Sequence, residues 1–132
     1  MNKTNKNTKI LIVEDDPAAR GVYLAILEKS GFEVVVAING KDGLEKAIEA
    51  TPDLILLDIC MPIMDGFAML SELRKSGEYG KNVPIILLTN LSADDEEIIK
   101  KVVQTEPVYY IVKSGFSIND LVGKINDALS SK

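Results

Sequence analysis

The stretch Leu54-Ile-Leu-Leu-Asp58 is an apolar run that ends abruptly in a carboxylate. Similar short runs recur along the chain, the last of them weaker than the others, at Lys9–Val13, Glu33–Ile38, Pro84–Thr89 and Val108–Lys113. Nearly continuous β-branched runs of this length are typical of strands that are buried on both faces of a parallel sheet. The segments between the runs have helical spacing, so strand and helix alternate along the chain. This alternation predicts an α/β fold in which helices cover both faces of a five-stranded parallel sheet.

Several helix boundaries carry a chemical signal. Asp16-Pro17 predicts a side-chain cap followed by the first residue of a helix, which ends at Gly31 and turns Val22 toward the core. A second helix is expected from Gly40 to Glu49, with Ile48 facing inward. Further helix starts are indicated by a turn or by a pair of capping residues, at Asp65-Gly66, at Ser92 with Asp95, and at Ser117 with Asp120.

Composition limits the classes of function. The chain of 132 residues suits one domain, which we expect over residues 9–130 after a flexible tail at residues 1–8. A net charge of −5 disfavours binding to nucleic acid or to anionic lipid. One cysteine and no histidine exclude an internal disulfide, Cys/His zinc sites and a histidine base. No signal peptide and no membrane-spanning run are evident, so a cytoplasmic location is expected.

Polar residues follow the predicted strands at the point where each apolar run stops. Glu14-Asp15 follows the first run, Asp58 and Thr89 end the third and fourth, and Lys113 closes the fifth. Ligands of an open doubly wound sheet bind beyond the carboxyl ends of its strands, where the strand order reverses. If the order is 2-1-3-4-5, Asp15 and Asp58 lie together at that point.

Three carboxylates at one place repel one another, which favours protonation of some of them unless a cation or Lys113 compensates their charge. Oxygen ligands in a shallow, hydrated pocket suit Mg²⁺, with Mn²⁺ as the alternative ion. Such an ion also orients a phosphoryl group, which makes Asp58 a candidate nucleophile that forms an aspartyl-phosphate. Thr89 and Lys113 are then candidates for contacts with the phosphoryl oxygens.

These residues, together with the stretch Met61-Pro-Ile-Met-Asp65-Gly66 after Asp58, resemble the receiver domain of two-component response regulators over Lys9 to Leu129. The resemblance is to the single-domain, chemotaxis-regulator type. It implies a flavodoxin-like sheet of order 2-1-3-4-5, with Asp58 as the phosphoacceptor. It also implies metal ligation by Asp15 and Asp58 through their side chains, by Glu14 as the second acid, and by Cys60 through its carbonyl. Thr89 and Lys113 take the phosphate-contacting positions, and Thr89 and Tyr110 the positions of the conformational switch.

The function implied by the resemblance is Mg²⁺-dependent acceptance of a phosphoryl group from a histidine kinase or a histidine phosphotransfer protein. The protein is then a phosphoacceptor that catalyses its own phosphorylation and dephosphorylation, and not an enzyme that acts on a separate substrate. We expect a stand-alone monomer or weak dimer that signals through a protein partner, without contacts to nucleic acid or membrane.

Other interpretations of the same residues stay open. One is a docking module of the same family that no longer accepts phosphate. Another is an aspartyl-nucleophile phosphatase, although that class needs an acid where this chain has Cys60. A flavin-binding module would need a Ser/Thr/Gly-rich loop at Glu14-Asp15-Asp16-Pro17. Tyr110 also suits a packed core aromatic. The chain departs from the receiver pattern at Ser114, where proline is usual, and at Asn90, where a small residue is usual.

Overall fold

The computed structural model describes residues 8–59, 66–89, 97, 100, 108–112 and 117–130. Its centre is a five-stranded sheet of order β2-β1-β3-β4-β5 in which every pair of neighbours is parallel. This order confirms the expected doubly wound topology. The strands are β1 (Lys9–Val13), β2 (Glu33–Ala37), β3 (Leu54–Asp58), β4 (Ile85–Thr89) and β5 (Val108–Val112).

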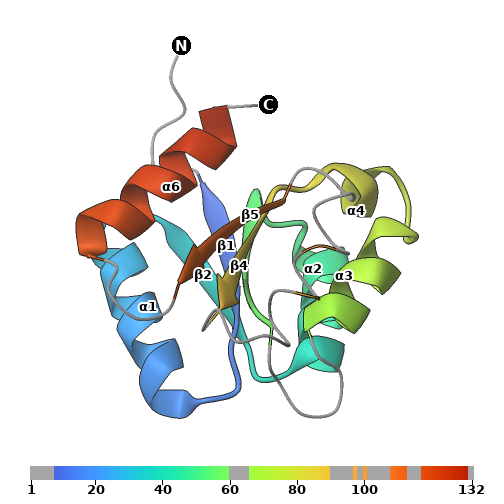
Figure 1. Ribbon diagram of the computed structural model, residues 1–132, viewed down its shortest axis with the longest axis horizontal. Coiled ribbons are helices and arrows are strands. Elements are labelled where there is room, and N and C mark those ends of the chain that lie inside the picture. The colour runs from blue at the N-terminus through green and yellow to red at the C-terminus, as the bar shows by residue number, and fades with distance from the viewer. Residues whose placement is uncertain are drawn as a thin grey trace.

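Helices cover both faces of the sheet (Figure 1). One face carries α1 (Pro17–Lys29) and α6 (Ile118–Ser130), and the other carries α2 (Gly40–Ala50), α3 (Gly66–Arg74) and α4 (Glu78–Asn82). None of the helices in the described part of the chain has the length and apolarity that a bilayer crossing requires. The helix expected after Ser92 and Asp95 begins outside the described residues.

The apolar runs of β1 to β4 are continuous because each of these strands contributes to two hydrophobic cores. Leu11 and Leu57 pack toward α2 and α3, whereas their neighbours Ile10 and Leu56 pack toward α1 and α6, and all four are fully buried. Burying one large aliphatic side chain contributes about 1.5 to 3 kcal/mol, so the central strands are held firmly from both sides. The sheet is therefore a rigid base for the residues at its carboxyl edge.

Capping chemistry sets both ends of α1 and the start of α6, as the sequence predicted. The Asp16 carboxylate accepts a hydrogen bond from the Ala19 amide at 3.1 Å. At the other end Gly31 has a φ of 95°, and the amides of Gly31 and Phe32 donate back into the last turn of α1. Ser117 and Asp120 form a reciprocal capping box, with both hydrogen bonds at 3.0 Å.

Two predictions about helix faces are wrong. Val22 is 55% exposed and Ile48 is 51% exposed. The buried stripe of α1 runs through Tyr23 and Leu27, so Val22 lies beside it in solvent. Helix α2 approaches the sheet through small buried residues, including Ala47. The side chain of Ile48, the next residue, points away from the sheet. The short α4 was not predicted, because five residues are too few to show a helical period.

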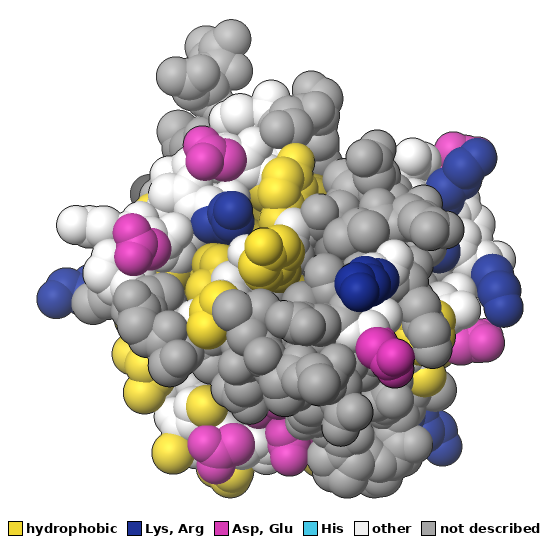
Figure 2. All heavy atoms as spheres, viewed as in Figure 1, with side chains coloured by type: hydrophobic (Ala, Val, Ile, Leu, Met, Phe, Trp, Pro, Cys, Tyr) yellow, Lys and Arg dark blue, Asp and Glu magenta, His cyan; other side chains and the backbone are white. Residues whose placement is uncertain are grey.

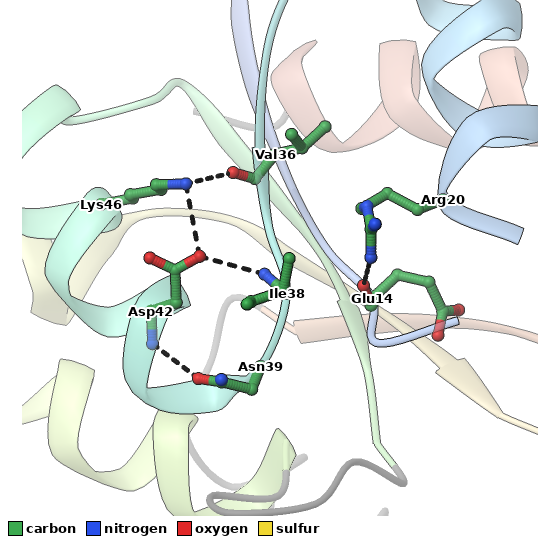
Figure 3. Close-up of polar contacts among 7 residues, drawn as sticks. All are labelled: Glu14, Arg20, Val36, Ile38, Asn39, Asp42 and Lys46. Carbon is green, nitrogen blue, oxygen red and sulfur yellow. Dashed lines mark hydrogen bonds and ion pairs between the residues drawn. The ribbon is translucent and has the colours of Figure 1, made fainter. Parts of the chain in front are cut away.

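Side chains of α2 cover the open edge of the sheet at β2 (Figure 3). The Lys46 amine donates to the Val36 carbonyl at 2.7 Å, and the Asp42 carboxylate accepts from the Ile38 amide at 3.0 Å. Both main-chain groups face away from β1, because the carbonyl of Ala37 between them faces β1. Asp42 and Lys46 also form an ion pair with each other at 3.3 Å. Together they occupy main-chain hydrogen-bonding groups that an edge strand otherwise leaves exposed.

A second polar network lies near the amino ends of the strands, away from the candidate site. The Tyr79 hydroxyl donates to the Pro52 carbonyl at 2.6 Å. Burial raises the pKa of Tyr79 above its ordinary value, and the negative charge of Asp53 acts in the same direction. Burial also lowers the pKa of Arg74 to about 10. The Arg74 guanidinium donates to two main-chain carbonyls around α4, at 2.9 and 2.8 Å.

Replacing Tyr79 by Phe tests this network. At neutral pH the Tyr79→Phe variant should be less stable by about 1 kcal/mol, because the hydrogen bond to Pro52 is lost. An unfolded phenol ionises near pH 10 while the folded one stays neutral, so the contribution of Tyr79 to stability is present below about pH 10 and declines above it. Urea unfolding of both proteins between pH 7 and pH 11 should show the difference shrinking only in the alkaline range. A difference that stays constant to pH 11 would contradict this account.

Helix α3 begins directly against the end of β3. The Gly66 amide donates to the Ile59 carbonyl at 2.9 Å. A Cβ at Gly66 would lie 2.7 Å from the Asp58 carbonyl oxygen and 2.8 Å from the Ile59 Cα. These are main-chain atoms that cannot give way without moving the strand end. Only glycine therefore allows α3 to start here with Asp58 in its present position.

A matched pair of Gly→Ala substitutions tests this close approach. Gly66→Ala should lower the free energy of unfolding by about 1 to 3 kcal/mol, because the new methyl group overlaps the main chain. Gly21→Ala in α1 is the control, since nothing lies within 4 Å of its Cβ position. It should raise stability by about 0.5 to 1 kcal/mol through helix propensity. Equal effects of the two substitutions in denaturant unfolding would refute the packing argument.

Candidate functional site

Three carboxylates meet at the carboxyl ends of β1 and β3. These strands are neighbours, and Val13 of β1 lies opposite Leu57 of β3, so the residues that follow them reach the same edge. Glu14, Asp15 and Asp58 each offer a carboxylate oxygen within 4.8 Å of the other two. Glu14 and Asp58 are buried, whereas Asp15 is half-buried. The acids that the sequence analysis grouped therefore lie together in the structure.

The electrostatics of this cluster favour a cation. At an effective dielectric constant of about 20, two full negative charges 4.8 Å apart repel each other by about 3 kcal/mol. Three such pairs approach the entire net stability of an ordinary domain, which is about 5 to 15 kcal/mol. An ion that binds these oxygens reverses the sign of the interaction. The donor set is made only of oxygen, the preference of hard divalent cations.

The loop that carries Glu14 and Asp15 is organised by the start of α1. One Glu14 carboxylate oxygen accepts a hydrogen bond from the Asp16 amide at 3.2 Å. The Arg20 guanidinium reaches back from α1 and donates to the carbonyl of Glu14 at 2.9 Å and of Asp15 at 3.4 Å (Figure 3). Asp16 acts as the helix cap, as predicted. Arg20 was not predicted, because its contacts are with main-chain carbonyls, which leave no signature in the sequence.

The other predicted site residues fall in different parts of the chain. The main chain of Thr89 ends β4 opposite Val112 of β5, at the same edge of the sheet as Asp58. Lys113 and Cys60 lie outside the described residues. So do Ser114 and Asn90, the positions where the chain departs from the receiver pattern.

Tyr110 lies on β5 with 47% of its surface exposed, so it is not a packed core aromatic. It borders an open groove of about 460 Å³ between β5 and α6. Figure 2 shows hydrophobic side chains reaching the surface beside β5 and α6, with charged side chains near them. The groove is lined by Tyr110, Ile111, Asn119, Asp120, Gly123, Lys124 and Asp127.

Comparisons with known proteins place the chain in a family. A family model for the response regulator receiver domain matches residues 10–126. Hybrid signal transduction histidine kinase D of Dictyostelium discoideum is 38% identical over 93% of this chain, which corresponds to 8% of that kinase. Protein PilH of Pseudomonas aeruginosa is 37% identical over 68% of this chain and 74% of its own length. The chain spans only part of the transcriptional regulators that it resembles, with 37% of RpaA from Synechocystis and 49% of ycf27 from Pyropia yezoensis covered.

The solved structures agree with this assignment. The receiver domain of a sensor histidine kinase from Pseudomonas aeruginosa superposes with a TM-score of 0.81 at 30% identity, covering 93% of this chain and 98% of that domain. That receiver was solved with a magnesium ion coordinated in its active site cleft. The sheet order, the acid cluster at its carboxyl edge and the match over residues 10–126 lead to one conclusion. The chain belongs to the response regulator receiver domain family of two-component systems.

Proposed function

We propose that this receiver accepts a phosphoryl group on Asp58 in a Mg²⁺-dependent reaction. The observation that carries the proposal is the convergence of the Glu14, Asp15 and Asp58 carboxylates within 4.8 Å at the carboxyl edge of the sheet. Asp58 ends the central strand β3, and core packing on both faces of the sheet holds that strand in place. A nucleophile in this position is fixed in space before its substrate arrives.

The residues present fit a divalent cation. Asp15 and Asp58 would bind it through their side chains, with Glu14 as the second acid and Cys60 through its carbonyl. Mg²⁺ is the proposed ion and Mn²⁺ the alternative, because both take oxygen ligands. The magnesium-bound receiver of Pseudomonas aeruginosa supports this choice. When bound, the ion supplies positive charge that neutralises phosphoryl oxygens.

The chemistry proposed for Asp58 is an in-line displacement at phosphorus. A carboxylate oxygen of Asp58 attacks the phosphorus of a phosphohistidine on a histidine kinase or a phosphotransfer protein. The new P–O bond forms as the P–N bond breaks, and the imidazole leaves. Attack by water on the aspartyl-phosphate later returns the carboxylate and releases phosphate. The Thr89 hydroxyl and the Lys113 amine are proposed to contact the phosphoryl oxygens during both steps.

The output is proposed to be a protein–protein interaction. Phosphorylation brings roughly two negative charges to Asp58, and Thr89 ends the neighbouring strand. Thr89 in turn lies opposite Val112, two residues after Tyr110. A movement of Thr89 toward the phosphoryl group would therefore displace β5, which carries Tyr110, through the pairing of β4 with β5. Stand-alone action, a monomeric or weakly dimeric state and the cytoplasmic location remain predictions, as does the division into a tail at residues 1–8 and a domain at residues 9–130.

Phosphorylation by a small donor tests the function. Incubation with acetyl phosphate and Mg²⁺ should add the mass of one phosphoryl group, and hydroxylamine should remove it. Chelation of Mg²⁺ should prevent the modification, because the carboxylate cluster would then repel the donor. Asp58→Asn should abolish it, while Asp127→Asn, which removes an exposed carboxylate from α6, should leave it intact.

Intact-protein mass spectrometry separates the alternatives. Equal labelling of the Asp58→Asn variant would refute the assignment of the acceptor. A folded wild-type protein that takes up no label would favour the docking module that does not accept phosphate. Continuous release of phosphate from added phosphomonoesters would instead indicate a phosphatase.

A further inference from the structure

Arg20 connects α1 to the acidic loop before it. Its main-chain amide donates to the Asp16 carbonyl at 2.9 Å, as the helix requires. Its side chain turns back along the helix, and one guanidinium nitrogen contacts the carbonyls of Glu14 and Asp15 together, at 2.9 and 3.4 Å. A single side chain therefore ties down the main chain of two of the three clustered acids.

Helix electrostatics alone would not place a cation here. The amino end of a helix carries partial positive charge, which favours acidic residues and disfavours arginine. Arg20 is nevertheless the fourth residue of α1, and the first turn holds no acidic residue. The carbonyl oxygens of Glu14 and Asp15 carry partial negative charge, which offsets the unfavourable interaction of Arg20 with the helix dipole. The loop, and not the helix, therefore explains the position of Arg20.

The direction of the contacts matters for cation binding. In Figure 3 the guanidinium meets the main-chain carbonyl of Glu14, while the Glu14 carboxylate points away from Arg20. That carboxylate accepts instead from the Asp16 amide at 3.2 Å. Arg20 thus fixes the loop without pairing with the carboxylate that belongs to the cluster.

We propose that Arg20 is a positioning residue, which holds the main chain of Glu14 and Asp15 so that their carboxylates converge with Asp58 on one cation. The inference rests on the proposed Mg²⁺ site. Groups that orient metal ligands from behind raise metal affinity by limiting the motion of those ligands. In this receiver two of the proposed ligands, Glu14 and Asp15, lie on a loop, and Arg20 connects that loop to a helix packed on the sheet.

The sign of the effect distinguishes positioning from charge. A positive guanidinium near the cluster repels Mg²⁺, so its removal should tighten binding if charge alone mattered. Loss of positioning should weaken binding. The two explanations therefore predict opposite changes for the same substitution.

The test is isothermal titration of Mg²⁺ into wild type, Arg20→Ala, Arg20→Lys and Lys29→Ala. Lys29→Ala is the control, because it removes the same charge from the exposed far end of α1. We expect Arg20→Ala to bind Mg²⁺ about tenfold more weakly. Arg20→Lys should fall between Arg20→Ala and wild type, since an ammonium keeps the charge but not the planar donor group. Lys29→Ala should match wild type.

A measurement on the metal-free protein covers the case in which a variant is poorly folded. Amide hydrogen exchange of Asp16 should accelerate in Arg20→Ala, because its acceptor on Glu14 is no longer held, while amides in the middle of α1 keep their protection. Loss of protection along the whole helix would assign Arg20 a general structural role and overturn the proposal.

The outcomes separate this inference from the proposed function. If wild type binds no Mg²⁺, the proposed function fails, and the positioning role fails with it. If wild type binds Mg²⁺ and Arg20→Ala binds it as tightly as Lys29→Ala, or more tightly, only the positioning role is overturned.

Discussion

The convergence of Glu14, Asp15 and Asp58 is the constraint that the rest of this receiver must satisfy, because carboxylates this close repel one another. Acids within 4.8 Å of one another separate unless the surrounding structure prevents it. The sheet provides that restraint, since β1 and β3 are buried on both faces and end at the same edge. Gly66 lets α3 begin against β3, and Arg20 anchors the loop after β1. Apolar packing thus holds together a charged cluster that is suited to a cation.

Much of this arrangement could be predicted from the sequence, because its causes are local. β1 and β3 have the predicted boundaries, and Pro84 explains why β4 starts one residue later than expected, since proline has no amide hydrogen for the ladder. The caps at Asp16 and Ser117 are confirmed for the same local reason. The meeting of Asp15 and Asp58 followed from the strand order, to which the family resemblance contributed.

The features that were missed depend on tertiary contacts. Val22 and Ile48 satisfy a helical period but lie beside the buried stripe, whose width depends on how closely each helix approaches the sheet. Arg20 contacts main-chain carbonyls, which have no signature in the sequence. The roles of Lys113 and Cys60 remain predictions, since both lie outside the described residues.

Thermal unfolding of wild type and Asp58→Asn, each in EDTA and in Mg²⁺, tests the central claim most directly. In EDTA the variant should melt at a higher temperature, because one of three repelling charges is gone. Mg²⁺ should raise the melting temperature of wild type by binding the folded state, and should raise that of the variant much less. A variant that melts below wild type in EDTA, or that gains as much from Mg²⁺, would contradict the account.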